Sequence, residues 1–286
     1  MTAQTAFVRV FGQTDPGKVR TNNEDAFVVS DLTGAAPIHA MGSSATFEVG
    51  DRGVLLAVSD GMGGAEAGEV ASALVLDALR LGLSTARPSS VEGALRTSVE
   101  AANKRVWNTA RQTGRDGMGA TLTAMLFYAG CAYIAEVGDS RAYVLRGQRL
   151  VQLTRDQSYV QSLLDSGALT QEQADASEYK NLILQAMGLR PDVVVVLNRL
   201  ALHRRDRFLL CSDGLSGKLQ DGEILGIVRD AATLESACSQ LIALALDRGG
   251  EDNITVVLAD AEGEGLPASM DGERVSLETP PDRAGT

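Results

Sequence analysis

The strongest constraint on this sequence is a pattern that occurs twice, a short apolar run that ends in Ser-Asp-Gly. The first copy lies within residues 54–64 and contains Asp60, and the second lies within residues 208–214 and contains Asp213. Each apolar run predicts a buried strand. A carboxylate at the mouth of a buried strand is costly unless another group satisfies it, and a metal cation is the usual solution. We therefore expect the fold to bring these two aspartates together.

Two further aspartates stand next to apolar runs. Asp139 follows residues 132–137, and Asp252 precedes residues 254–258. Carboxylate oxygens suit hard divalent ions, so the four acids predict Mg²⁺ or Mn²⁺ rather than zinc. Without ions, clustered carboxylates repel one another, whereas two ions about 4 Å apart can activate a water molecule and hold a phosphoryl oxygen. The alternative is that the four are unrelated aspartates of turns and helix caps.

The chain is acidic, with a formal net charge of −11 over 286 residues and a pI near 4.7. This charge argues against nucleic acid or an anionic membrane as the main partner. It would also repel a phosphorylated substrate unless metal ions reverse the sign locally. The two histidines, His39 and His203, stand near no Ser or Cys motif, so catalytic triads and histidine-rich zinc sites are poorly supported.

The sequence also bears on the compartment of the protein. No apolar run approaches the roughly 18 residues of a membrane span, and the first residues lack the basic and apolar regions of a signal peptide. Cys131, Cys211 and Cys238 stand alone in apolar surroundings without CxxC spacing, which predicts packed thiols rather than disulfides or zinc ligands. We therefore expect a cytoplasmic protein with no membrane partner.

The periodicity predicts one domain that mixes strands and helices. Strands are expected at residues 6–12, 26–30, 121–127, 132–137, 142–145, 193–197, 208–211 and 254–258. Helices are expected at residues 66–83, 89–112, 223–228 and 234–246, with short helices within 154–190 and a loose connection over 31–53. From Ala261 onward the chain loses periodicity and gains Gly, Pro and acids, so residues 261–286 are expected to be a disordered acidic tail.

Six motifs occur in an order that resembles the metal-dependent protein phosphatases, the PPM or type-2C Ser/Thr phosphatase family, in its bacterial form. They are Arg20-Thr21-Asn22-Asn23-Glu24-Asp25, Val58-Ser59-Asp60-Gly61-Met62-Gly63-Gly64, Gly119-Ala120-Thr121, Val137-Gly138-Asp139-Ser140-Arg141, Ser212-Asp213-Gly214-Leu215 and Asp252-Asn253-Ile254-Thr255. Each motif alone is weak, but the ordered set is specific. The resemblance covers roughly residues 7–260, which gives a phosphatase domain over residues 1–260.

The resemblance implies an α+β fold, a four-layer α-β-β-α sandwich of two antiparallel sheets flanked by helix pairs. The metal site would lie at one edge and hold two or three Mn²⁺ or Mg²⁺ ions. A substrate-guiding flap would occupy about residues 154–190. Hydrolysis would be direct attack by metal-activated water on phosphoserine or phosphothreonine, with no phosphoenzyme.

The family's site residues carry over onto matching positions. Asp60 would bridge both metals and Gly61 would contribute its carbonyl oxygen. Asp213 and Asp252 would complete one metal site.

The remaining roles are also implied by the resemblance alone. Asp25 would help to hold the second ion, partly through water. In bacterial members, the acid that matches Asp139 takes part in a third, weaker metal site. Arg20 would hold the phosphate of the substrate, which suits the bidentate geometry of a guanidinium group.

The sequence departs from the family pattern in two places. Some members have His where Met62 stands, as the proposed proton donor to the leaving group, and many bacterial members have His just after the Gly pair, where this chain has Ala65. The proton donor is therefore water or undefined. In the flap, Glu178-Tyr179-Lys180-Asn181 replaces the usual His-Pro-x-x-Asn, which leaves the substrate preference open.

The leading hypothesis is a phosphoprotein phosphatase that acts as a monomer on phosphorylated proteins and opposes a Ser/Thr kinase. One alternative is a catalytically silent family member that binds phosphoproteins or regulates partners. The retained acids disfavour it, since their loss would mark such a protein. A two-metal phosphoesterase for small molecules or nucleic acid is disfavoured by the acidic charge and the motif order.

Overall fold

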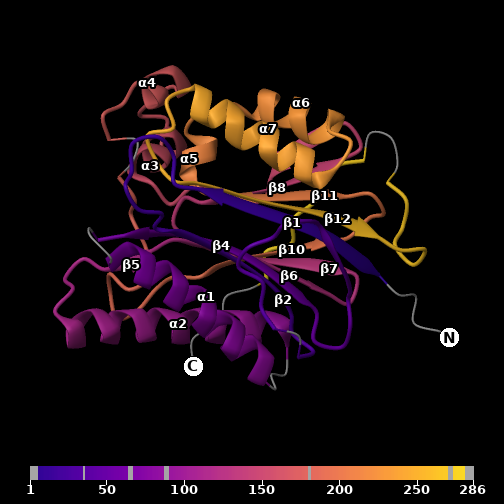
Figure 1. Cartoon of the computed structure of the whole chain (residues 1–286), viewed down its shortest axis with the longest axis horizontal. Helices are drawn as coiled ribbons and strands as arrows, with labels where there is room; N and C mark the ends of the chain where they lie inside the picture. The colour runs from indigo at the N-terminus through magenta and orange to yellow at the C-terminus, as the bar shows by residue number, and fades with distance from the viewer. Residues whose placement is uncertain are drawn as a thin grey trace.

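Two antiparallel β-sheets lie face to face in the computed structural model of this chain, with helices on both outer faces (Figure 1). The structure describes residues 6–34, 36–63, 67–86, 90–179, 182–269 and 273–280. This arrangement confirms the expected four-layer α+β sandwich.

Each sheet is antiparallel throughout. The first sheet has the order β3 (Ala45–Glu48), β1 (Phe7–Asp15), β12 (Ile254–Glu262), β11 (Arg207–Cys211), β8 (Arg141–Arg146) and β9 (Arg149–Gln152). The second sheet has the order β10 (Val196–Ala201), β7 (Cys131–Val137), β6 (Leu122–Tyr128), β4 (Val54–Met62) and β2 (Asp25–Asp31). The short strand β5 (Gly119–Ala120) pairs with the end of β4.

Helix pairs cover the two outer faces. The second sheet is covered by α1 (Ala67–Thr85) and α2 (Val91–Thr113), and the first by α6 (Asp221–Asp230) and α7 (Leu234–Asp247) (Figure 1). Three shorter helices, α3 (Tyr159–Asp165), α4 (Gln171–Asp175) and α5 (Asp213–Ser216), lie at one end of the sandwich. At the N-terminus of α4, Thr170 and Gln173 form a capping box.

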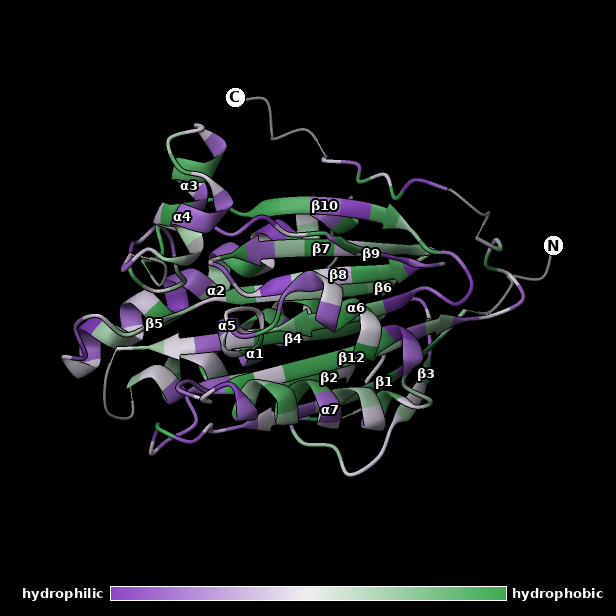
Figure 2. Ribbon diagram, turned by 90° about the horizontal axis from the view of Figure 1, so that it is seen from above, coloured by the Kyte–Doolittle hydropathy of each residue, from purple (hydrophilic) through white to green (hydrophobic). Residues whose placement is uncertain are grey.

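Both faces of the central strands are buried, which explains their continuous apolar sequences. In β4, Leu55 and Ala57 pack toward α1 and α2, whereas Val54, Leu56 and Val58 pack between the sheets. Figure 2 shows the resulting hydrophobic colour along β4, β6 and β12. A strand covered on both sides has no polar face and therefore reads as an unbroken apolar run.

The antiparallel topology brings four strand ends to one end of the sandwich. Strands β4 and β7 both pair antiparallel with β6, so they run in the same direction and their last residues lie at the same end. Strands β11 and β12 pair with each other, so the end of β11 lies beside the start of β12. These are the four positions next to which the sequence has Asp60, Asp139, Asp213 and Asp252.

Two expected elements differ from the structure. The strand expected at residues 193–197 is displaced, because pairing with β7 sets the register and begins at Val196 opposite Glu136. Val194 instead lies outside the sheet, with its backbone N–H and C=O bound by the side-chain amide of Gln185. The connection expected over 31–53 contains β3, whose residue Phe47 packs on the intersheet core.

The prediction of disorder from residue 261 does not hold for the described residues of that segment. Strand β12 continues to Glu262, and Leu266 is buried. Farther on, Glu278 forms an antiparallel bridge and an ion pair with Arg199 on β10, the outer strand of the second sheet. The physical reason is burial of apolar side chains, because Val275 and Leu277 pack against the intersheet core. The overall composition of this segment does not show that these two residues have a partner.

Two further sequence expectations concern membrane-spanning helices and the cysteine thiols. Within the described ranges, none of the helices combines the length and the apolar character that crossing a bilayer requires. The three cysteines are free thiols, and Cys211 and Cys238 are buried, as their apolar surroundings predict.

The intersheet core generates a stability prediction. Phe127 and Phe208 meet edge to face across the two sheets, with ring centroids 5.2 Å apart, and both are fully buried. We expect Phe208→Ala to lower the free energy of unfolding by about 3–5 kcal/mol, because it removes buried area and leaves a cavity. Urea denaturation measures this change. Leu81→Ala on the exposed face of α1 is the control and should change stability by less than about 0.5 kcal/mol. An equal effect of both substitutions would contradict the prediction.

Candidate active site

A pocket of 510 Å³ opens at the end of the sandwich where the four strand ends meet. It brings together residues that lie far apart in the sequence. Its lining includes Arg20, Glu24, Asp60, Gly61, Met62, Asp139, Ile183, Asp213, Asp252 and Asn253. Six of the seven site residues expected from the sequence therefore line one pocket, and Asp25 is the exception.

A network of hydroxyl groups ties Asp60 to Asp139. The Thr121 hydroxyl accepts a hydrogen bond from the Asp60 backbone N–H at 2.9 Å and lies 2.8 Å from the Ser140 hydroxyl. The Ser59 hydroxyl donates to the Thr121 carbonyl oxygen at 2.6 Å. These groups are buried, so the end of β4 and the turn that carries Asp139 are held in a fixed relation.

Asp25 lies beneath the pocket and joins the two sheets. Its Oδ2 accepts hydrogen bonds from the hydroxyls of Ser212 and Thr255, at 2.6 and 2.7 Å. On its own sheet, Asp25 stands opposite Asp60 in the pairing of β2 with β4. The Ser212 hydroxyl also accepts from the Thr255 backbone N–H at 2.9 Å. The Asp25 carboxylate, through Ser212, therefore also helps to hold the backbone from which Asp213 extends.

The loop that carries Arg20 is held by Asn253. The side-chain amide of Asn253 donates to the carbonyl oxygens of Pro16 and Asn22, at 2.9 Å each, and accepts from the Glu24 N–H at 2.7 Å. Arg20 in turn donates to Asp252 at 2.8 Å. The half-exposed guanidinium group is thus placed beside the acids while other N–H groups remain available to a ligand.

Two glycines of the repeated motif permit close backbone approach. A Cβ atom on Gly61 would overlap the carbonyl oxygen of Gly68, and a Cβ atom on Gly214 would overlap the carbonyl oxygen of Asn253. Only glycine fits at these positions without movement of the neighbouring backbone. The glycines after both aspartates therefore bring separate backbone segments together at the pocket.

Burial and mutual repulsion raise the pKa values of the clustered acids. Burial raises the pKa of Asp25 to about 7 and of Asp139 to about 7, and in both the charge of Asp213 adds to the effect. Burial also raises the pKa of Asp60 well above its usual range, with the charge of Asp25 as the next cause. The pKa of Asp213 rises through burial and through the charge of Asp252. Such a cluster is stabilised by added positive charge.

The donor set fits hard divalent cations. The buried atoms Asp213 Oδ1 and Asp25 Oδ1 have no hydrogen-bond partner among the described residues, which is costly unless a cation satisfies them. Carboxylate oxygens and a backbone carbonyl are the ligands that Mg²⁺ and Mn²⁺ prefer. Within the described ranges, no group of three or more His, Cys, Asp or Glu side chains is arranged so that it could hold a metal ion by itself. The acids instead surround an open pocket, which leaves room for water and substrate.

The chain was also compared with known protein families. The family model described as "Protein phosphatase 2C" matches residues 21–254 of this chain. The chain belongs to the protein phosphatase 2C family.

Bacterial members of the protein phosphatase 2C family are similar over most of the chain. It is 38% identical to the serine/threonine protein phosphatase PstP of Mycobacterium tuberculosis over 261 residues, which is 91% of this chain but 46% of that protein. It is 34% identical to the serine/threonine phosphatase stp of Listeria monocytogenes, over 87% of this chain and 94% of that protein. The chain thus spans about half of one relative and nearly all of the other.

A solved structure of the same family supports the fold. It is the catalytic domain of PstP in complex with two manganese ions, with a TM-score of 0.74 and 35% identity. The match covers 90% of this chain and 99% of that domain.

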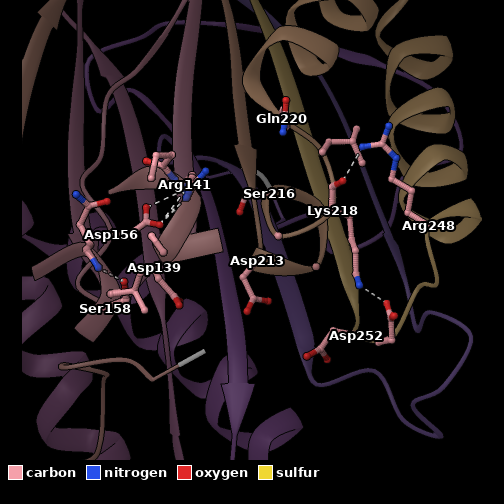
Figure 3. A pocket seen from close by; sticks show the side chains of 18 of the residues that line it. Asp139, Arg141, Asp156, Ser158, Asp213, Ser216, Lys218, Gln220, Arg248 and Asp252 are labelled. Atoms are coloured by element: carbon pink, nitrogen blue, oxygen red, sulfur yellow. Dashed lines mark hydrogen bonds and ion pairs between the residues drawn. The ribbon is translucent and has the colours of Figure 1, made fainter. Parts of the chain in front are cut away.

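A second pocket adjoins the first in this protein phosphatase 2C chain. It has a volume of 610 Å³, lies between the flap and the segment after β11, and shares Asp139, Asp213 and Asp252 with the first pocket. Figure 3 shows Asp213 and Asp252 at its lower end, with the Arg141–Asp156 pair on one side. The basic residues in its wall are paired with acids, so apart from the shared aspartates the wall is close to neutral.

The two departures from the family pattern fall differently in the structure. Met62 lines the first pocket, and neither His39 nor His203 does. Ala65 lies outside the described residues. In the flap, Glu178 and Tyr179 are described and exposed, whereas residues 180 and 181 are not described.

Sequence reasoning missed three residues that shape the pocket. Glu24 lines it, and burial raises the pKa of its carboxyl. Thr121 and Asn253 hold the backbone around it. All three lie inside the quoted motifs, so their membership of a motif was the available indication. The sequence alone does not show whether the side chain of Glu24 or that of Asp25 faces the pocket.

The raised pKa values generate a pH prediction for the metal-free protein. The folded state holds protons on Asp25 and Asp139 up to pH about 7, whereas the unfolded chain releases them near 3.8. The folded state therefore binds more protons between these values, and stability should fall as pH rises from about 4 to about 7. Since each pKa unit corresponds to about 1.4 kcal/mol, we expect a loss on the order of several kcal/mol, measured by denaturant unfolding in EDTA.

Asp139→Asn provides the control for this pH dependence. It removes one titrating group and should make the decline in stability shallower. Addition of Mn²⁺ at pH 8 should restore stability to the wild type. A metal-free protein that is more stable at pH 7 than at pH 5 would contradict the prediction.

Proposed function

We propose that the pocket hydrolyses phosphoserine and phosphothreonine in proteins with the help of two divalent ions. The observation that carries this proposal is that four strand-end aspartates from both sheets and one arginine line a single pocket. A phosphate ester carries negative charge, so it can enter so acidic a pocket only together with cations. The bacterial relatives, which are named as Ser/Thr phosphatases, support the substrate class.

The aspartates and one glycine are the proposed ligands of the ions. Asp60 would be shared between them, with Asp213 and Asp252 on one side and the Gly61 carbonyl oxygen on the other. Glu24 faces the pocket and Asp25 supports it from beneath, so these two would complete the second position. When bound, Mg²⁺ or Mn²⁺ would supply Lewis acidity, which lowers the pKa of water and neutralises phosphate charge.

A third ion near Asp139 remains part of the proposal. Asp139 lines both pockets, and burial raises its pKa. Its site would share Asp213, which borders both pockets as well.

The protein's own side chains orient the substrate. Arg20 would hold the phosphate through its guanidinium N–H groups, in a position set by Asp252. Asn253 holds the loop that carries Arg20, and Thr121 holds the backbone of Asp60. No His, Cys or Lys is among the described residues that line this pocket, so water is the proposed proton donor to the leaving alkoxide.

The wider role follows from the chemistry. Phosphorylated proteins would be the substrates, and a Ser/Thr kinase would supply them. We propose a monomer in the cytoplasm, since the buried cysteines are free thiols. The silent alternative, a module that binds phosphoproteins without hydrolysis, is disfavoured because none of the metal-binding acids is missing.

The decisive experiment is hydrolysis of a phosphothreonine peptide in Mn²⁺, in Mg²⁺ and in EDTA. We expect phosphate release with either ion and none in EDTA. Asp60→Asn should lower kcat by at least about a hundredfold, because it weakens the ligand shared by both ions. A dye assay for released phosphate measures the metal dependence and the kcat of each variant.

Asp77→Asn is the matched control for Asp60→Asn. Asp77 is an exposed acid on α1, so its substitution removes the same charge and should leave kcat unchanged. Folded wild-type protein that binds Mn²⁺ but releases no phosphate would favour the silent alternative.

A second variant tests the phosphate ligand separately from the metal ligands. We expect Arg20→Ala to raise KM for the phosphopeptide about tenfold, because it removes a charge-assisted fork to the phosphate. Arg20→Lys keeps the positive charge but loses the bidentate geometry, so its KM should lie between those of wild type and Arg20→Ala. Mn²⁺ affinity, measured by calorimetry, should change little. An unchanged KM in Arg20→Ala would remove this residue from the substrate site.

A further inference from the structure

The exposed side of α2 carries a group of basic residues, although the protein as a whole is acidic. Residues 101–115 contain four lysine or arginine residues and no acidic residue, whereas the whole chain has a net charge of −11. Lys104, Trp107 and Arg111 follow one another at spacings of three and four, so they lie on one face of the helix. The opposite face, which includes Val106, is buried. We call the following residues the α2 basic surface: Lys104, Arg105, Trp107 and Arg111.

The cations of the α2 basic surface have no acidic partner within the part of the chain that the structure describes. Lys104, Arg105 and Arg111 are exposed, and none of them forms an ion pair. The arginines of the pocket walls differ in this respect, as the pairing of Arg141 with Asp156 shows. Carboxylates of another molecule can therefore approach the α2 basic surface without first displacing an internal partner.

The helix dipole does not account for these cations. Basic side chains stabilise the carbonyl end of a helix, but the effect falls off within the last turn. Lys104 and Arg105 lie about two turns before the last residue of α2, Thr113. At the end itself, the Gly114 N–H donates to the Ala110 carbonyl oxygen. The backbone therefore caps the helix without help from these side chains.

Trp107 places an aromatic ring between the cations. It is the only tryptophan of the chain, and it is partly exposed. The guanidinium carbon of Arg111 lies 5.0 Å from the centre of the Trp107 ring, which is a cation–π contact. Tryptophan and arginine are enriched among the residues that contribute most binding energy at protein interfaces. The contact also orders Arg111 in advance, so less side-chain entropy is lost when a carboxylate binds.

The α2 basic surface leads toward the end of the sandwich that contains the first pocket. Figure 1 shows the last turns of α2 at the same end as α5, which begins at Asp213. Beyond the helix, Gly117 contacts the pocket wall: a Cβ atom on Gly63, which lines the pocket, would lie 2.9 Å from the Gly117 carbonyl oxygen. A protein bound to α2 would therefore be held on the same end of the molecule as the pocket.

We propose that the α2 basic surface is a docking site for an acidic segment of a partner protein. From Lys104 to Arg111 the helix rises by about 10 Å, which about three or four residues of an extended chain can span. Aspartate and glutamate side chains of such a segment would pair with the cations and cover Trp107. Nucleic acid fits less well, because a long polyanion would also meet the negative charge of the rest of the protein. The inference does not depend on the proposed hydrolysis.

Titration with a short glutamate-rich peptide tests this inference. Fluorescence anisotropy of the fluorescein-labelled peptide gives its affinity. An unlabelled copy is followed by the emission of Trp107, which reports on this surface because the chain has no other tryptophan. We expect saturable binding at low ionic strength, with a change in Trp107 emission, and weaker binding as salt is added. A lysine-rich peptide of equal length should leave the emission unchanged. Absence of saturable binding by the glutamate-rich peptide would overturn the inference.

The triple variant Lys104→Gln/Arg105→Gln/Arg111→Gln locates the binding. We expect it to weaken the affinity for the glutamate-rich peptide about tenfold, at a factor of about two for each exposed ion pair that is lost. All three side chains are exposed, so the midpoint of thermal unfolding should stay close to that of wild type.

The matched control is Arg149→Gln/Arg204→Gln/Arg205→Gln. These arginines are also exposed, and among the described residues they too form no ion pair. They lie at the opposite end of β8 and β11 from the first pocket. The control removes the same charge and should change the affinity by less than about twofold. Equal weakening in both triple variants would overturn the inference, because the overall charge would then explain the binding.

Two other occupants of the α2 basic surface would also overturn the inference. A single-stranded oligonucleotide with the same number of charges that binds more tightly than the peptide would identify a nucleic-acid site. Sedimentation in which wild type forms a dimer and the α2 triple variant does not would identify an interface between two copies of this chain.

Discussion

Repulsion among buried carboxylates is the constraint on which the rest of this structure depends. Asp25, Asp60, Asp139 and Asp213 lie close enough that the charge of one raises the pKa of another. They come from both sheets, so the packing of one sheet on the other is what holds these acids together. The hydroxyl of Ser212 binds Asp25 Oδ2 across that junction and offsets part of the cost of burying this carboxylate.

The pocket could be predicted from sequence to the extent that its residues end buried strands. Asp60 and Asp213 share a motif, and antiparallel pairing necessarily brings the end of one strand beside the start of the next, which places Asp252 near Asp213. Asn253 could not be assigned in this way, because its hydrogen bonds reach residues more than two hundred positions away in the sequence. Its role depends on the tertiary path of a loop, and no local pattern records that path.

The sandwich was predictable from the motif order, whereas its strand boundaries were not. The apolar run at residues 193–197 has the composition of a strand, but hydrogen bonding to β7 begins only at Val196. The short strand β3 lacks a strong pattern and exists because β1 offers it a partner. In both cases the neighbouring strand decides which residues pair, so single-segment propensity is overridden by register.

The contact between Glu278 and Arg199 covers an otherwise open strand. An uncovered outer strand offers its unpaired N–H and C=O groups to any other extended chain, and sheets of separate molecules join in this way. A recombinant fragment ending at residue 260 would uncover β10 and remove the packing of Val275 and Leu277. The segment after the last strand therefore protects the second sheet against edge-to-edge aggregation, and a fragment prepared for crystallisation is best extended through residue 280.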